Sequence, residues 1–177
     1  MDEGKAQEAI TNLQELVHTH PDDPAGRIAL GKAFTKAGRL DDALEQFAEA
    51  VRSQPDDFEA QQALANGFIR VNRPDEAVNP LLAAIRLRPD SADPHLNYGT
   101  ILANEGKVGR AIAEFSEAVR LKPDLVPAHL NLAVALLEQK RVSGAADHLK
   151  KVIQIDPRNA RARQLLESIQ AQHNPGG

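Results

Sequence analysis

The stretch PDDPAGRIALGKAFTKAGRLDDALEQFAEAVRSQPDD, residues 21–57, begins and ends with the same three residues. Its flanking prolines, Pro21 and Pro55, are 34 residues apart, and the spacing continues through three more prolines: Pro89, Pro123 and Pro157. A strict period of this length indicates one supersecondary unit that is copied along the chain. The sequence therefore predicts four full units, at residues 24–57, 58–91, 92–125 and 126–159, with half units at residues 1–23 and 160–173.

Each full unit carries two apolar stripes with the spacing of an amphipathic helix. In the first unit, Leu30 and Phe34 belong to one stripe, and Leu40, Leu44 and Phe47 belong to the other. Between the stripes stand residues that tolerate the left-handed backbone of a helix end, although lysine fits this role less well: Gly38, Asn72, Gly106 and Lys140. Each unit is thus predicted to form a helix, a tight turn and a second, antiparallel helix. One such pair buries too little apolar surface to fold alone, so stacking must supply the core.

Local signals predict where the first helices begin. Good N-cap residues precede most of them: Asp23, Asp57, Ser91 and Asn159. Leu125 breaks this column, and we expect Asp124 to cap in its place. Pro80 falls inside a predicted second helix, where it removes a backbone donor, so a kink or local distortion is expected there.

Columns of large and small residues appear when each unit is counted from its first residue. The eighth place is always small, with Gly31, Ala65, Gly99 and Ala133. The twenty-fourth place is always large, with Phe47, Leu81, Phe115 and Leu149. These columns resemble the tetratricopeptide repeat over essentially the whole chain, with repeats similar to those of the O-linked N-acetylglucosamine transferase and of bacterial scaffold proteins. The resemblance implies an all-α, right-handed superhelical solenoid of antiparallel helix pairs that ends in a capping helix at residues 160–173, followed by a disordered tail at residues 174–177.

The resemblance departs at the fourth place, where the family often has tryptophan. This chain has shorter or polar side chains there: Arg27, Gln61, His95 and His129. We expect the departure to weaken one packing contact per repeat. The remaining columns agree in register over four copies, so the family resemblance stands.

In tetratricopeptide domains the first helices line a concave groove that binds an extended peptide or a partner helix, and this resemblance implies the same role here. The predicted groove residues are Lys32, Lys36, Asn66, Arg70, Asn97, Thr100, Asn104, Asn131 and Glu138. Asn97 and Asn131 share the sixth place, which is similar to the asparagine ladder of the transferase repeats, where amides hold a peptide backbone. Asparagine tolerated on an exposed helix face explains the pair equally well. The residue order of the carboxylate clamp that binds chaperone tails is not present.

The half unit at residues 1–23 matches only the second helix of a repeat. In a complete repeat its apolar residues would pack against a first helix, which the sequence does not contain. These residues are Ile10, Leu13, Leu16 and Val17, and we call them the end face. Either upstream repeats were removed or another chain covers this face, because leaving it in water is unfavourable. A structural spacer or a self-association module is thus the alternative to a binding scaffold.

The sequence gives little support for a catalytic or cofactor-binding site. Gly26, Gly31 and Lys32 have the spacing of a phosphate-binding loop, but Ala33 follows where Ser or Thr must bind magnesium, and the segment lies inside a predicted helix. The six histidines include no metal-binding spacing on one helix, although His95 and His129 hold equivalent places in neighbouring repeats. We predict no enzyme activity, no cofactor and no metal.

Composition and charge restrict the remaining functions. The net charge is −4, and no basic stripe interleaved with aromatic residues is present, so nucleic acid is not an expected partner. No apolar run is long enough to span a membrane, and no leader sequence begins the chain. As given, the sequence is typical of a cytoplasmic protein, and a periplasmic or membrane-anchored parent is the alternative if the chain is a fragment. The expected partner is a protein or peptide.

Overall fold

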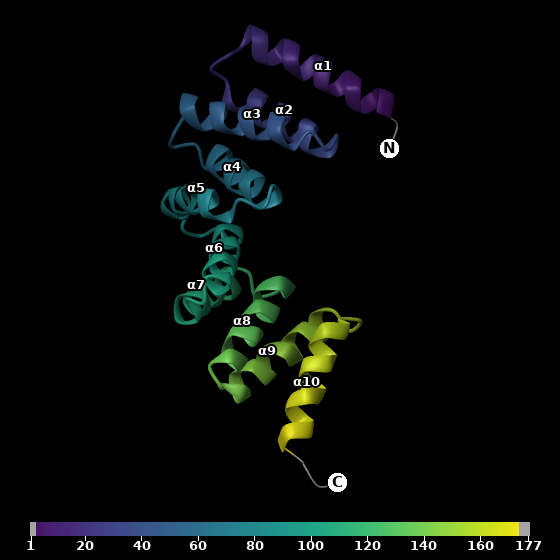
Figure 1. Cartoon of the computed structure of the whole chain (residues 1–177), viewed down its shortest axis with the longest axis vertical. Coiled ribbons are helices and arrows are strands. Elements are labelled where there is room, and N and C mark those ends of the chain that lie inside the picture. The colour runs from purple at the N-terminus through teal and green to yellow at the C-terminus, as the bar shows by residue number, and fades with distance from the viewer. Residues whose placement is uncertain (1–2, 174–177) are drawn as a thin grey trace. The chain divides into compact units, whose positions relative to one another are not determined.

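The computed structural model describes residues 3–173, which form ten α-helices and no strand. The helices are α1 (Glu3–Thr19), α2 (Pro24–Lys36), α3 (Leu40–Ser53), α4 (Phe58–Arg70), α5 (Pro74–Leu87), α6 (Ala92–Asn104), α7 (Val108–Leu121), α8 (Val126–Glu138), α9 (Val142–Ile155) and α10 (Ala160–His173). Each predicted full unit contains one pair of helices, which confirms the predicted all-α repeat array (Figure 1). Residues 1–2 and the predicted tail at residues 174–177 lie outside the described residues.

Contacts divide the chain into two compact units, unit one (Met1–Pro89) and unit two (Asp90–Gly177). In unit one each helix from α1 to α4 packs on the helix that follows it, and α2 also contacts α4. In unit two the same holds from α6 to α9, and α6 also contacts α8. Each unit therefore places first helices beside first helices, which is the arrangement that a shared binding face requires. The single solenoid over residues 1–173 stays a prediction.

The turns inside the repeats have the predicted left-handed backbone. The φ angles are 77° at Gly38, 59° at Asn72, 75° at Gly106 and 59° at Lys140. The residue after each turn closes it by donating a backbone hydrogen bond into the last turn of the first helix, as Arg39 does to the carbonyl of Phe34 at 2.9 Å. Lys140 adopts the same conformation although its Cβ makes it less favourable there.

The N-cap predictions are confirmed by side-chain bonds at three helices, confirmed in position only at Ser91, and wrong for Asp124. Asp23, Asp57 and Asn159 each accept a hydrogen bond from a backbone amide of the first turn. Ser91 stands at the N-cap position of α6 but makes no such bond, and Pro94 at the third helical position removes one of the two amides that could donate it. At α8 Leu125, and not Asp124, occupies the N-cap position, with a proline in the first turn that leaves fewer amides to satisfy.

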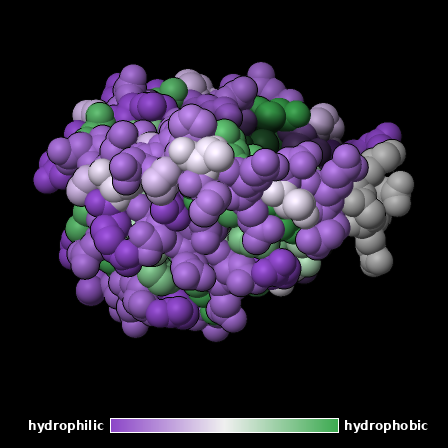
Figure 2. Space-filling view, turned by 90° about the horizontal axis from the view of Figure 1, so that it is seen from above, coloured by the Kyte–Doolittle hydropathy of each residue, from purple (hydrophilic) through white to green (hydrophobic). Residues whose placement is uncertain are grey.

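Large residues of the second helices pack against small residues of the first helices. A Cβ added to Gly31 would lie 2.8 Å from Cδ1 of the Phe47 ring, and one added to Gly99 would lie equally close to Cδ1 of Phe115. Gly67 approaches the other side of Phe47, where an added Cβ would lie 3.1 Å from Cδ2. Each phenylalanine therefore fixes how closely the helices approach. Figure 2, which looks from above onto the view of Figure 1, shows a mainly hydrophilic surface with small, separate hydrophobic patches.

Pro80 does not end the helix that contains it. α5 continues from Pro74 to Leu87 and has the same length, 14 residues, as α3, α7 and α9. Pro80 itself is buried. The fold thus accommodates the missing backbone donor within a continuous helix, and the degree of bending stays a prediction.

Two glycines of α2 provide a matched test of this packing. Gly31→Ala should lower the free energy of unfolding by about 1–3 kcal/mol, because the new methyl group would overlap the Phe47 ring. Gly26→Ala should raise it by about 0.5–1 kcal/mol, because its Cβ would meet only ordinary contacts and would remove backbone freedom from the unfolded chain. Urea unfolding followed by circular dichroism measures both. Equal effects of the two substitutions would contradict the proposed overlap.

Candidate functional site

Eight of the nine predicted groove residues line two cavities, one in each unit. The first pocket has a volume of about 290 Å³ and lies between the first helices α2 and α4. It is lined by Lys32, Thr35, Lys36, Phe47, Ala63, Asn66, Gly67 and Arg70. Four of these are predicted groove residues, and Phe47, Ala63 and Gly67 supply its apolar wall. Phe47, which the groove prediction missed, contributes from the second helix α3.

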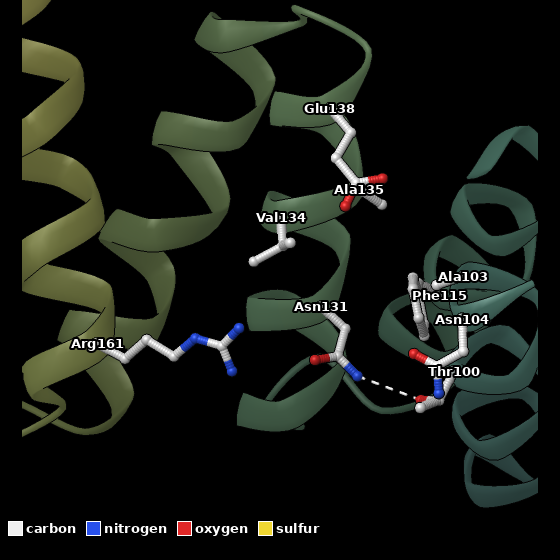
Figure 3. A pocket seen from close by; sticks show the side chains of 9 residues that line it. All are labelled: Thr100, Ala103, Asn104, Phe115, Asn131, Val134, Ala135, Glu138 and Arg161. Carbon is white, nitrogen blue, oxygen red and sulfur yellow. Dashed lines mark hydrogen bonds between the residues drawn. The ribbon is translucent and has the colours of Figure 1, made fainter. Parts of the chain in front are cut away.

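The second pocket has a volume of about 180 Å³ and lies in unit two (Figure 3). It is lined by Thr100, Ala103, Asn104, Phe115, Asn131, Val134, Ala135, Glu138 and Arg161. In Figure 3 the amide of Asn131 points from α8 toward Thr100, to whose hydroxyl oxygen it donates a hydrogen bond of 3.3 Å. Arg161 extends toward this pocket from α10, a position that the groove prediction also missed.

The two pockets are the same structural feature at different repeats. Every residue of the first pocket has a counterpart in the second that lies two repeat lengths further along the chain, as Phe47 and Phe115 do. Arg161 is the single addition. The repeat geometry alone therefore forms the cavity, and the side chains at its edge decide its chemistry.

The edges of the pockets differ in charge. Lys32, Lys36 and Arg70 give the first pocket three cations and no carboxylate. Their counterparts in the second pocket are Thr100, Asn104 and Glu138. The second pocket therefore offers amides, a hydroxyl, one carboxylate and the guanidinium of Arg161, which suits a polar and charge-balanced ligand segment.

Asn97 is the one predicted groove residue that lines neither pocket. It is half-buried and has an interaction with its surroundings. Its repeat partner Asn131 lines the second pocket, where its amide is held by Thr100. A role for the two asparagines as a peptide ladder stays a prediction.

The fourth place of the repeat, where the family often has tryptophan, ties four of the five first helices (α2, α4, α8 and α10) to the proline before them. The side chain donates a hydrogen bond to the carbonyl oxygen of that proline, and we name this bond the fourth-place clip. The clips are Arg27 to Pro21 at 2.9 Å, Gln61 to Pro55 at 2.7 Å, His129 to Pro123 at 3.0 Å, and Arg163 to Pro157. A hydrogen bond is thus present where many members of the family have the packing contact of a tryptophan.

Fourth-place side chains also contact the second helix of their own repeat. His129 Nδ1 lies 2.9 Å from Nδ1 of His148, and His95 Nδ1 lies 2.7 Å from the Glu114 carboxylate. In contrast to the others, the buried Nε2 of His95 has no hydrogen-bond partner among the described residues. The equivalence of His95 and His129, noted from the sequence, therefore reflects two separate structural bonds and no shared site.

The histidine pair of unit two has a defined protonation pattern. Because His129 Nε2 donates to the Pro123 carbonyl, its Nδ1 is the acceptor of a bond from His148. Burial lowers the pKa of His148, the neighbouring His129 lowers it further, and Asp147 opposes both effects. These effects favour the neutral form of the His148 ring.

Helix α1 buries part of the predicted end face. Ile10 is 1% exposed and belongs to the core of unit one, and Leu13 and Val17 pack against that core. The expectation that Ile10 is exposed is wrong, because a second helix also packs on the first helix that follows it, here α2. Leu16, at 41% exposure, and Ala9 remain accessible.

The comparisons with known proteins agree with this architecture. Models of the tetratricopeptide repeat match residues 1–67 and 102–169, and a second model of the same repeat matches residues 63–126. The chain belongs to the tetratricopeptide repeat family. Members of this family typically act as protein–protein interaction scaffolds and not as enzymes.

Several solved structures share the fold along most of the chain. YrrB, described as a tetratricopeptide repeat protein with an unusual peptide-binding site, aligns with a TM-score of 0.78 and 19% identity over 93% of this chain and 84% of its own. A MamA structure aligns with a TM-score of 0.79 and 21% identity over 90% and 93%. MamA from Desulfovibrio magneticus RS-1 aligns with a TM-score of 0.77 and 21% identity over 89% of each chain. A search of curated sequences finds no significant match.

Two further findings concern residues 3–173. None of their helices combines the length and apolar character that a bilayer crossing needs. Histidine, aspartate and glutamate side chains nowhere gather in this part of the chain in a group of three or more that could hold a metal ion.

The histidine pair predicts how the stability of unit two depends on pH. The pKa of His148 in the folded chain is below the ordinary value of 6.5, so the unfolded chain binds more protons once the pH falls through that value. Acidification from about pH 7.5 to about pH 5.5 should therefore lower the unfolding midpoint. His148→Gln keeps a donor for His129 and should reduce this loss, whereas His18→Gln, at an exposed position, should not. An unchanged pH dependence in His148→Gln would contradict the assignment.

Proposed function

We propose that the chain is a scaffold that binds an extended peptide or partner segment along the face formed by its first helices. The observation that carries this proposal is the repeated pocket, which recurs at equivalent places and in both units is lined mainly by first-helix residues. A cavity that recurs with the repeat suits a ligand that is itself a chain with side chains at regular intervals.

The size and lining of the pockets favour a peptide over a small molecule. Their volumes, about 180 and 290 Å³, are at or below the range of about 300–1,000 Å³ that is typical of small-molecule sites. Each is thus a suitable size for side chains of a longer ligand. Asn66, Asn104 and Asn131 add amides at the pocket edges, and an amide has both a donor and an acceptor for a peptide backbone. The peptide-binding site named for YrrB supports the same mode of action.

A display selection with random decapeptides tests this function. Asn104→Ala combined with Asn131→Ala should weaken binding of the selected peptides about tenfold, because two hydrogen-bonding groups at the second pocket are lost. The matched control is Asn12→Ala combined with Asn79→Ala, which removes two exposed amides from α1 and α5. Fluorescence anisotropy measures the affinities. Peptides that bind both double variants as well as the unaltered chain would contradict the proposed surface.

Self-association is a second candidate function, favoured by the environment of Leu16. In the full repeats the equivalent residues are Ala50, Ala84, Ala118 and Val152, and all are 0% exposed. Leu16 is larger than alanine and is 41% exposed. A first helix supplied by another copy of the chain would bury it.

Sedimentation velocity tests the second candidate. If α1 mediates self-association, the unaltered chain should sediment as a concentration-dependent mixture of monomers and dimers, and Leu16→Glu should be monomeric because it places a charge in the apolar contact. Leu82→Glu, at an apolar residue of α5 with 43% exposure, is the control and should leave the mixture unchanged. A monomer at every concentration would exclude this function.

A further inference from the structure

We propose that the first pocket binds an acidic residue of the partner peptide that stands beside an apolar side chain. This inference rests on the proposed function and adds to it the chemical class of the partner segment. The second pocket, which has the same geometry but different edge residues, is the internal comparison.

The three cations of the first pocket differ from the other cations of unit one. In the described part of this unit, every other arginine has a carboxylate or carbonyl partner. These pairs are Arg27 with Pro21, Arg39 with Asp42, Arg52 with Glu49, Arg73 with Glu76, Arg86 with Asp56 and Arg88 with Glu59. Lys32, Lys36 and Arg70 have no ion pair among the described residues. Lys32 and Lys36 stay unpaired although residues 1–57, in which they lie, contain twelve acidic and only six basic side chains. An unpaired set of cations in an acidic segment favours a carboxylate supplied from outside.

The apolar wall of the pocket explains the second part of the proposal. The Phe47 ring is fixed between Gly31 and Gly67, and Ala63 continues the apolar surface. An apolar side chain that rests there would exclude water from the neighbouring cations. Charge pairs are stronger where water is excluded, so the two halves of the ligand should reinforce each other.

Helix stability does not account for the cations. Lys36 and Arg70 lie in the last turns of α2 and α4, where a positive charge favours the helix dipole. However, α6 and α8 have the same length, 13 residues, and carry no basic residue in the last turn. Lys32 lies one turn before the end of α2 and gains little from the dipole.

A peptide fits the pocket better than nucleic acid does. Single-stranded nucleic acid is held by aromatic rings on which bases stack, together with an extended row of cations. Phe47 is the single aromatic residue that lines the pocket and is only 4% exposed, so the pocket has no row of ring faces on which successive bases could stack. Three cations around one cavity of about 290 Å³ match one or two carboxylates.

Peptide selections on chains that differ in the charge of the first pocket test the proposal. A random decapeptide library, displayed without a free carboxyl terminus, is selected on the unaltered chain and on the variant K32Q/K36Q/R70Q. The control R52Q/R86Q/R120Q removes the same charge from exposed positions on α3, α5 and α7. Peptides from the unaltered chain should be enriched in Asp or Glu beside Leu, Ile, Phe or Met, and this enrichment should persist for the control and vanish for the pocket variant.

Synthetic peptides then measure how much the acidic residues contribute to the binding affinity. Replacing the acidic residues of a selected peptide by Asn or Gln should weaken its binding to the unaltered chain about tenfold, and should leave its binding to K32Q/K36Q/R70Q unchanged. Circular dichroism melts verify that the variants are folded.

Four outcomes would overturn the inference. The first is a selected pool without enrichment in acidic residues, and the second is equal affinity for the acidic peptides and their amide versions. The third is an equal loss of acidic enrichment for the control R52Q/R86Q/R120Q. The fourth is binding of oligo(dT) that is stronger than binding of the peptides and depends on the same three cations. Selected peptides that depend on Asn104 and Asn131 but show no preference for acids would overturn this inference and leave the proposed function intact.

Discussion

The contact between a large side chain of each second helix and a small residue of the first helices is the constraint on which the other features depend. Phe47 between Gly31 and Gly67 sets the distance between α2, α3 and α4, and it also forms part of the first pocket. Phe115 has the same two roles in unit two. The residues that make the core and the residues that line the pockets are therefore partly the same, so the proposed function would couple stability to recognition.

The residues at the pocket edges, in contrast, are free to vary. Residues at the ninth and thirteenth places contribute little to the core, since Lys32, Lys36, Arg70 and Asn104 are all exposed. Their charge can change without cost to the fold, because surface substitutions usually alter stability by less than about 0.5 kcal/mol. Two pockets of one geometry thus acquire different chemistry, as expected for a family that binds many partners.

Most of the fold was predictable because five prolines and the columns between them fix the register of every helix. The exceptions have local physical causes. Ser91 makes no side-chain cap bond at a helix where Pro94 removes one of the two candidate amide donors, and Ile10 is buried because a second helix has two packing faces. Helix periodicity selected eight of the residues that line the two pockets, whereas it did not select Phe47 and Arg161, because their position depends on neighbouring helices. The large residue at the twenty-fourth place was the one signal for Phe47.

The fourth-place clip has a consequence for how such a chain is divided into exchangeable modules. The donor belongs to the start of one repeat and the proline carbonyl to the end of the previous one, as in the bond from Gln61 to Pro55. A segment cut before Phe58 would separate the two partners, whereas a segment that begins at Pro55 carries both. Duplication or recombination that starts at the proline would therefore transfer a repeat that has this clip together with both of its partners, whichever of arginine, glutamine or histidine supplies the donor.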